Sequence, residues 1–248
     1  ILMRKLFFLK YCLFILFFSF INANDANHLI FSRVCISPNE AEMIEIYNPT
    51  SLPINLNEEG PGAYYITDGT NPTQSKYYYN LVDSESLAWS GNPYDFFVSF
   101  PENLIINPES SILFGIHDPT SFDNYYDTAP DITLTDLEPG AYYDMEFDLD
   151  ILGDNSEVLI LFYWNESDIT VQDVDYFLWG NSTYGVDKSN IEGYNPDTPL
   201  EQQIYIESTS DHFSYFRDSA EEYDEISSEG NGITGHNETS ENLQNSYT

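Results

Sequence analysis

The amino-acid sequence predicts an all-β fold, and two observations carry that prediction. Short apolar runs recur along the chain and are separated by clusters of Asn, Asp, Gly and Pro, which is typical of strands joined by turns. No segment shows the long amphipathic period that a surface helix would have. Hydrophobic residues make up 42% of the chain and aromatic residues 16%, so we expect a folded core despite the acidic composition.

The first strands follow from the apolar runs of the N-terminal half. Residues 29–36 are mainly apolar and end at a Ser-Pro turn signal. Residues 42–47 alternate in polarity, so Ile44 and Ile46 are expected to face the core and Glu45 the solvent. Further strands are predicted at the apolar runs 54–56, 63–67, 77–81, 96–100, 104–106 and 111–116.

The C-terminal half contains the most apolar run of the chain. Residues 157–164 predict a strand buried on both faces, and residues 171–179 predict its hairpin partner. A short helix is expected at 121–126 and the last strand at 213–217. Residues 218–248 are acidic and poor in apolar side chains, so they are expected to form a flexible C-terminal segment.

The N-terminus has the layout of a secretory signal peptide. A basic region at 4–10 leads into an apolar run at 11–21, and the small residue Ala23 stands at the expected cleavage position. A signal peptide over residues 1–23 predicts a secreted protein, extracellular or at the cell surface, with no membrane span in the mature chain. The alternative is an uncleaved anchor, although the apolar run is shorter than the ~20 residues that a spanning helix needs.

The charge balance limits the classes of partner. The chain has 42 acidic residues and a formal net charge of −35. Removal of the signal peptide leaves Arg33, Lys76, Lys188 and Arg217 as the basic residues, so the protein repels phosphate backbones and we expect no direct nucleic-acid binding. Cys35 is the cysteine that remains, and it is expected to be a small buried hydrophobe because it has no partner for a disulfide within the chain.

A series of segments has an order and spacing that point to a known family. They are 34–40 with 43–49 (MIEIYNP), 64–68, 105–115, 153–162 (GDNSEVLILF), and 172–180 (QDVDYFLWG) continuing to 186–188. Together these segments resemble the lamin-tail domain family, in its exported bacterial branch. The resemblance implies an immunoglobulin-like β-sandwich over residues 28–217, with long inserted loops and no catalytic residues. The chain departs from nuclear lamins because it has no coiled-coil rod and no C-terminal lipidation box.

The densest acidic cluster is a candidate calcium site. Asp144, Glu146, Asp148, Asp150 and Asp154 place several carboxylates in a short stretch, and hard cations take several oxygen ligands at once. The stretch does not match the full EF-hand loop, and a solvated acidic face is the alternative. Calcium is the cofactor that this pattern suggests.

The histidines suggest no metal centre. His28, His117, His212 and His236 match neither a zinc-finger nor a metalloprotease spacing. We therefore expect a hydrogen-bonded or exposed histidine at each position.

Paired carboxylates also suggest glycoside hydrolysis. Acids that alternate along 144–150 would share one face of a strand at about 7 Å, which lies within the range used by glycosidases. Asp173 and Asp175 form a second acidic pair. Such alternation arises easily in a chain with 42 acids, so no catalytic residue is predicted.

Aromatic side chains in an inserted region offer a candidate binding patch. Tyr77, Tyr78, Tyr79 and Trp89 could stack on a sugar or anchor a protein partner if they lie on exposed loops. The alternative is that half of a tyrosine-rich strand faces the core.

These features favour a secreted, non-catalytic, lamin-tail-like sandwich that acts as a protein-interaction or cell-surface structural module. Its partner would be an unidentified protein or a surface polysaccharide. The alternative from a different class is a calcium-dependent carbohydrate- or matrix-binding module. A glycoside hydrolase with paired carboxylates is the third interpretation, and it requires two convergent carboxylates in a cleft, one with a raised pKa.

Overall fold

The computed structural model describes residues 24–58, 62–68, 75–89, 94–137, 151–208 and 213–248 of the chain. The predicted signal peptide lies outside these ranges, as do Asp144, Glu146, Asp148 and Asp150 of the candidate calcium cluster. None of the described helices is long and apolar enough to cross a membrane.

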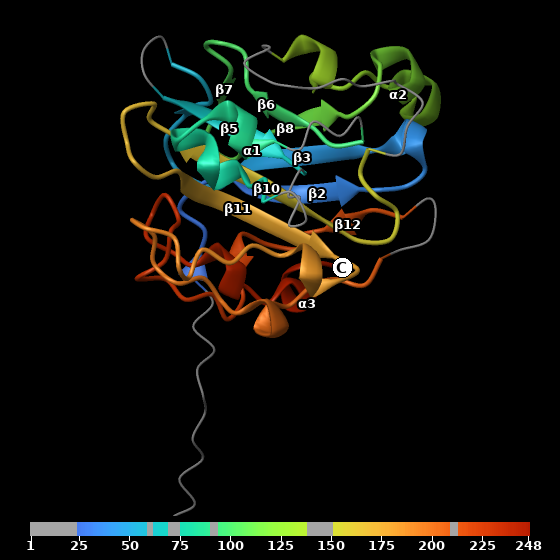
Figure 1. The fold of residues 1–248 in the computed structure, drawn as a ribbon. Helices are drawn as coiled ribbons and strands as arrows, with labels where there is room; N and C mark the ends of the chain where they lie inside the picture. Colours follow the sequence, from blue (N-terminus) through green and yellow to red (C-terminus); the bar gives the residue numbers. More distant parts are fainter. Residues whose placement is uncertain (1–23, 59–61, 69–74, 90–93, 138–150, 209–212) are drawn as a thin grey trace, which may run out of the picture.

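Two mainly antiparallel sheets pack against each other as a β-sandwich, which confirms the predicted all-β sandwich class (Figure 1). The larger sheet has five strands in the order β12-β2-β3-β8-β9. Neighbouring strands are antiparallel except β8 and β9, which run parallel. The bounds are Tyr215–Phe216 for β12, Ile30–Cys35 for β2, Met43–Asn48 for β3, Ser110–Gly115 for β8 and Ile132–Thr133 for β9.

The smaller sheet has four antiparallel strands in the order β11-β10-β5-β6. The bounds are Gln172–Trp179 for β11, Glu157–Trp164 for β10, Ala63–Thr67 for β5 and Phe97–Ser99 for β6. A register shift interrupts the β10–β11 ladder between Leu161 and Phe162.

Short elements complete the chain. β1 (Asn24–Asp25) pairs with β13 (Glu221–Glu222), and β4 (Ile54–Asn55) pairs with β7 (Ile105–Ile106). The α-helices are α1 (Glu85–Ala88), α2 (Pro119–Tyr126) and α3 (Leu243–Ser246). The 3-10 helices are η1 (Asn39–Ala41), η3 (Tyr78–Val82), η4 (Leu134–Asp136), η5 (Ser182–Tyr184), η6 (Leu200–Gln202) and η7 (Glu238–Ser240).

The core lies between the two sheets. Ile44 and Ile46 of β3 are fully buried while Glu45 is only half-buried, as the alternation predicts. Aromatic rings join the sheets, since Phe177 of β11 lies 5.3 Å from Tyr215 of β12 between ring centroids. Burying each large apolar side chain contributes about 1.5–3 kcal/mol, so this interface supplies most of the stability of the fold.

The structure confirms the hairpin predicted at 157–179 and the helix predicted at 121–126. β10 and β11 form the expected hairpin, and residues 158–162 of β10 are all buried. The helix expected at 121–126 is α2, whose N-cap is Asp118. The Asp118 carboxylate accepts hydrogen bonds from the backbone N–H groups of Thr120 and Ser121 at 2.9 and 3.2 Å.

The strand expected at 77–81 is wrong, because residues 78–82 form the 3-10 helix η3. Tyr78 and Tyr79 are consecutive, yet both side chains are buried. Successive side chains of a strand point to opposite faces, so a strand could not bury both against one core, whereas a helical turn can.

The C-terminal segment differs from the flexible segment that its composition suggests. It runs along β11 and extends the free edge of that strand, because the Ile233 N–H donates to the Asp173 carbonyl at 2.7 Å (Figure 1). Leu243 and Tyr247 are buried in the main core, and the Tyr247 hydroxyl donates to the Phe31 carbonyl at 2.7 Å. A few well-spaced apolar side chains thus attach a segment whose overall composition is acidic.

Substitution of Gly180 tests the close packing at the end of β11. Gly180 has φ +72°, and a Cβ there would collide with the backbone carbonyl of Asn155. Gly180→Ala is expected to lower the free energy of unfolding by about 3 kcal/mol or more, because backbone strain and overpacking each cost about 1–3 kcal/mol. Gly235→Ala is the control in urea denaturation, since Gly235 has φ +87° but open space around its Cβ position. Equal losses for the two variants would contradict the collision.

Candidate metal centre

Two histidines and three glutamates converge where the start of the described chain meets the C-terminal segment. We call this group the His–Glu cluster. It consists of His28, Glu222, Glu225, His236 and Glu238, all of them buried.

The pairing of β1 with β13 brings the first two members together. Asn24 lies opposite Glu222 in this ladder, and the Ala26 N–H donates to the Ala220 carbonyl at 2.7 Å. His28 follows directly after this contact. Its Nε2 atom lies 3.0 Å from Glu222 Oε1.

A turn within the C-terminal segment supplies the other members. The Asn237 N–H donates to the Ile226 carbonyl at 2.9 Å, so His236 and Glu238 lie across from Glu225. The turn needs glycine at position 230, because a Cβ on Gly230 would collide with the backbone of His236.

The potential ligand atoms form two groups that share His236, with the atoms of each group within 4.8 Å of one another, and the closest pair is in direct ion-pair contact. His236 Nδ1 is 2.7 Å from Glu225 Oε2 and 3.5 Å from Glu222 Oε2. His28 Nε2 is 3.8 Å from Glu238 Oε2. Two ligands of one Zn²⁺ ion lie about 3–3.5 Å apart, because each is about 2.0–2.2 Å from the metal.

The cluster is closed to solvent and poor in hydrogen bonds. Its most exposed member, Glu225, has only 8% of its surface accessible. Among the described residues, His28 Nε2, His236 Nδ1, Glu225 Oε2 and the two carboxylate oxygens of Glu222 contact only members of the cluster, as ion pairs. His28 Nδ1, Glu225 Oε1 and Glu238 Oε1 have no partner among these residues. Buried polar atoms of this kind cost about 1–3 kcal/mol each when unsatisfied, so a further binding group is expected between them.

The electrostatics of the cluster are those of a site that attracts a cation. Burial would raise the pKa of Glu222, but its contacts with His236 and His28 lower that pKa to about 2. Burial raises the pKa of Glu225 to about 7. Burial also raises the pKa of Glu238 well above its ordinary value. The contacts with Glu222 and Glu225 raise the pKa of His236 to about 10. Without a metal, protons must therefore compensate the crowded carboxylates.

The donor set selects the class of metal. Imidazole nitrogen together with carboxylate oxygen suits Zn²⁺, Mn²⁺, Fe²⁺ and similar divalent transition metals, whereas calcium takes oxygen ligands. The cluster could therefore hold a divalent transition-metal ion through His28, His236 and its glutamates. The spacing of the histidines in the sequence matches no known metal motif, so the sequence did not predict this arrangement.

The raised pKa values predict how the metal-free protein responds to pH. A group whose pKa is higher in the folded state stabilises the fold at low pH and loses that contribution as the pH rises through its folded pKa. Glu225 and Asp175, both raised to about 7 by burial, and His236, raised to about 10, act in the same direction. In EDTA, the melting temperature is expected to be higher at pH 5 than at pH 8. With saturating Zn²⁺ the trend should weaken or reverse, because protons compete with the metal for these ligands. A melting temperature in EDTA that rises from pH 5 to pH 8 would contradict this assignment.

The acidic residues that the sequence suggested as a site, where the structure describes them, lie outside the His–Glu cluster. Asp154 is half-buried in the loop before β10 and is not part of the His–Glu cluster. The second acidic pair is buried, and its members face cations of the chain itself. Asp173 lies 2.6 Å from Lys188 Nζ, and Asp175 lies 3.7 Å from Arg217 Nη2.

The predicted aromatic patch is divided between core and surface. Tyr78 and Tyr79 are buried, whereas Tyr77 and Trp89 are half-buried. Tyr77 stacks on Tyr79 with ring centroids 5.0 Å apart. These contacts favour the alternative that the tyrosines pack the interior, and they leave little aromatic surface for a ligand at this point.

The sequence contained one signal for the cluster. Glu222 and Glu225 are three residues apart, and His236 and Glu238 are two apart, within a segment that is otherwise Asn- and Ser-rich. His28 carries no such signal, because it joins the site only through the pairing of β1 with β13.

Comparison with known proteins gave no relative. No protein-family model, no curated protein and no solved structure matches this chain.

Proposed function

We propose that the protein is an exported, non-catalytic β-sandwich module whose C-terminal segment is fastened by a buried divalent transition-metal ion. One observation carries the proposal. The imidazoles of His28 and His236 and the carboxylates of Glu222, Glu225 and Glu238 form two groups that share His236, and the three ligand atoms of each group lie within 4.8 Å of one another.

A metal accounts for this arrangement better than ion pairs alone. Three carboxyl groups face two imidazoles, so without a metal at least one carboxyl group must hold a proton for the cluster to be neutral, even when both rings are protonated. Burying an uncompensated charge is costly, and a divalent ion removes that cost while it satisfies several ligand atoms at once. The ligands also come from opposite ends of the described chain, so the ion would close the fold.

The closed surroundings support a structural role over catalysis. Structural zinc sites have all their coordination positions filled by protein ligands, whereas catalytic sites keep one position open for water or substrate. The cluster offers more than four ligand atoms, and its members are all buried. We therefore assign the metal to stability of the module.

An interaction role is supported by a cation–aromatic group on the outer face of the larger sheet. The guanidinium of Arg33 lies 4.6 Å from the ring centroid of Phe216 and 5.9 Å from that of Tyr126. Phe216 and the nearby Phe213 are 46% and 60% exposed. Arginine and aromatic residues anchor many protein interfaces, so a protein partner on this face agrees with the lamin-tail-like interaction module that we propose.

Metal content tests the proposed function. Protein purified without chelators is expected to carry about one equivalent of zinc, manganese or iron per chain by mass spectrometric elemental analysis. His236→Gln should lose most of that metal. His117→Gln is the matched control, because His117 forms another buried histidine–glutamate contact, at 2.9 Å from Glu42, outside the cluster.

Two results would overturn the assignment. One is a folded protein that contains no transition metal and binds none when Zn²⁺ or Mn²⁺ is titrated into it. The other is equal loss of metal from the His236 and His117 variants. Saturable binding of calcium in place of these metals would favour the calcium-dependent binding module instead.

A further inference from the structure

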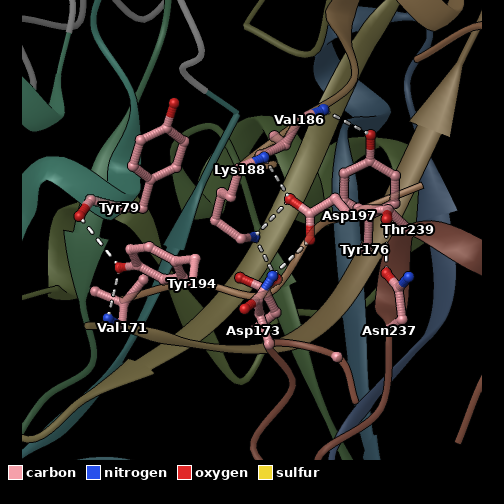
Figure 2. Close-up of polar contacts among 12 residues, drawn as sticks. Tyr79, Val171, Asp173, Tyr176, Val186, Lys188, Tyr194, Asp197, Asn237 and Thr239 are labelled. Carbon is pink, nitrogen blue, oxygen red and sulfur yellow. Dashed lines mark hydrogen bonds and ion pairs between the residues drawn. The ribbon is translucent and has the colours of Figure 1, made fainter. Parts of the chain in front are cut away.

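A second buried cluster, independent of the metal centre, surrounds the ammonium group of Lys188. Lys188 follows η5 in the chain, and its side chain is fully buried. Figure 2 shows the ammonium between the carboxylates of Asp173, from β11, and Asp197, from the loop before η6. Lys188 Nζ lies 2.6 Å from Asp173 Oδ2 and 3.3 Å from Asp197 Oδ2.

Tyrosines enclose this group. The Tyr78 hydroxyl donates to Asp173 Oδ1 at 2.5 Å and accepts a hydrogen bond from Lys188 Nζ at 2.8 Å. The rings of Tyr78 and Tyr194 lie 5.3 and 5.8 Å from Nζ, measured to their centroids. An amine, two carboxyl groups and a hydroxyl donor therefore meet in a pocket that excludes water.

We propose that Lys188 and Asp173 join in an intramolecular amide bond, with Asp197 as the proton carrier. In this step the ammonium of Lys188 passes one proton to Asp197. The neutral amine then attacks Cγ of Asp173, a C–N bond forms, and the Cγ–Oδ2 bond breaks. Oδ2 leaves as water with two protons, one from Asp197 and one from the nitrogen, so Asp197 ends as the carboxylate it was at the start. No oxidant, reductant or co-reactant is needed.

The surroundings favour each part of this condensation. Fixed contact between nucleophile and electrophile replaces a bimolecular encounter, which raises rates greatly when the groups are well oriented. Tyr78 donates a hydrogen bond to the oxygen on which negative charge develops. Exclusion of water favours amide formation and slows hydrolysis. Burial raises the pKa of Asp197, which suits it to accept a proton from the amine.

Before the condensation, Lys188 is charged and forms ion pairs with Asp173 and Asp197. Burial alone would lower the pKa of Lys188, but Asp173 and Asp197 hold that pKa above its ordinary value. The reaction therefore depends on proton transfer within the cluster. The bond would link β11 covalently to the segment after η5. The described residues contain a single cysteine, the buried Cys35, so no disulfide within them could provide such a link.

Trypsin digestion of the unfolded full chain tests the bond directly. Between Arg33 and the C-terminus the chain has cleavage sites after Lys76, Lys188 and Arg217. An amide at Nζ removes the positive charge that trypsin recognises, so cleavage should fail after Lys188 alone. The expected product is peptide 77–217, lighter than its sequence mass by one water molecule.

A second protease locates the partner of Lys188. Cleavage after glutamate gives peptide 167–192, which contains both Asp173 and Lys188, and peptide 193–201, which contains Asp197. A bond to Asp173 makes peptide 167–192 lighter by one water, whereas a bond to Asp197 joins the two peptides and would overturn the assignment. Cleavage after Lys188 at full peptide mass, the result expected of an ion pair only, overturns the proposal altogether.

One variant tests the role of Asp197 as proton carrier. Asp197→Asn keeps Lys188 and Asp173 but cannot shuttle the proton, so its peptide 77–188 should be released at full mass. A folded Asp197→Asn protein with the same missing water would show that Asp197 does not carry the proton. The wild-type peptide map decides the existence of the bond whether or not this variant folds.

Discussion

Removal of the divalent metal with a chelator is expected to destabilise the protein by about 4 kcal/mol relative to metal at about 1,000 times its dissociation constant. The reason is that the ion binds the folded state, in which the His–Glu cluster is assembled, and has no assembled site in the unfolded chain. For a chain of this size, about 1 kcal/mol shifts the melting temperature by about 2–4 °C, so the expected fall is roughly 10 °C. Thermal unfolding in EDTA and in excess Zn²⁺, at fixed pH and ionic strength, measures it.

Variants separate this effect from general chelator or salt effects. His236→Gln should melt at the same temperature with and without Zn²⁺, because it has lost a ligand. His117→Gln should keep the full response, since the His117–Glu42 contact lies outside the cluster. A wild-type protein whose melting temperature is indifferent to EDTA and to added metal would argue against a structural metal.

Arg217→Ala is expected to lower the free energy of unfolding by about 3–5 kcal/mol, because it leaves buried carboxylates without their cation. The guanidinium binds Glu241 through two contacts, at 2.7 and 2.9 Å, and lies 3.7 Å from Asp175. It also lies over the ring of Tyr247 at 4.8 Å from the centroid. Burial raises the pKa of Asp175 to about 7, and the charge on Arg217 opposes that shift. Urea denaturation measures the loss.

The stability lost in Arg217→Ala should depend on pH and on whether Glu241 keeps its charge. It should be larger at pH 8 than at pH 5, because Asp175 is charged at the higher pH and has then lost its nearest cation. The double variant Arg217→Met, Glu241→Gln should recover part of the stability, since it no longer buries the Glu241 charge. Arg33→Ala is the control and should cost about 1 kcal/mol or less, because Arg33 is half-buried on the outer face. A loss for Arg217→Ala no greater than that of Arg33→Ala would contradict the role of the buried pair.

Buried ionic groups thus attach the C-terminal part of the chain to the sandwich at several points. β11 contributes Asp173 to the Lys188 cluster and Asp175 to the Arg217 cluster. The His–Glu cluster joins the same segment to the strand at the start of the described chain. Specific partners therefore compensate several of the buried acids, which would otherwise repel one another.

The sequence by itself determined the fold class, because strand and turn signals are local. The alternation at 42–47 placed Ile44 and Ile46 in the core, and the apolar run at 157–164 marked the buried strand β10 with its hairpin partner. The helix expected at 121–126 corresponds to α2, which begins two residues earlier, at Pro119. The resemblance to lamin-tail domains stays a prediction, since it depends on these same local segments.

Only the tertiary structure decided which charged residues are buried and what each one contacts. The acidic composition of residues 218–248 predicted a flexible segment, yet Glu222, Glu238 and Glu241 are buried there. Composition cannot distinguish a solvated carboxylate from one compensated by a partner distant in the sequence. The pairing of β1 with β13 brings His28 to Glu222, and the packing of the two sheets brings Arg217, which follows β12, to Asp175 of β11. Such contacts between distant residues leave no periodic signal in the sequence, because the chain must fold before they form.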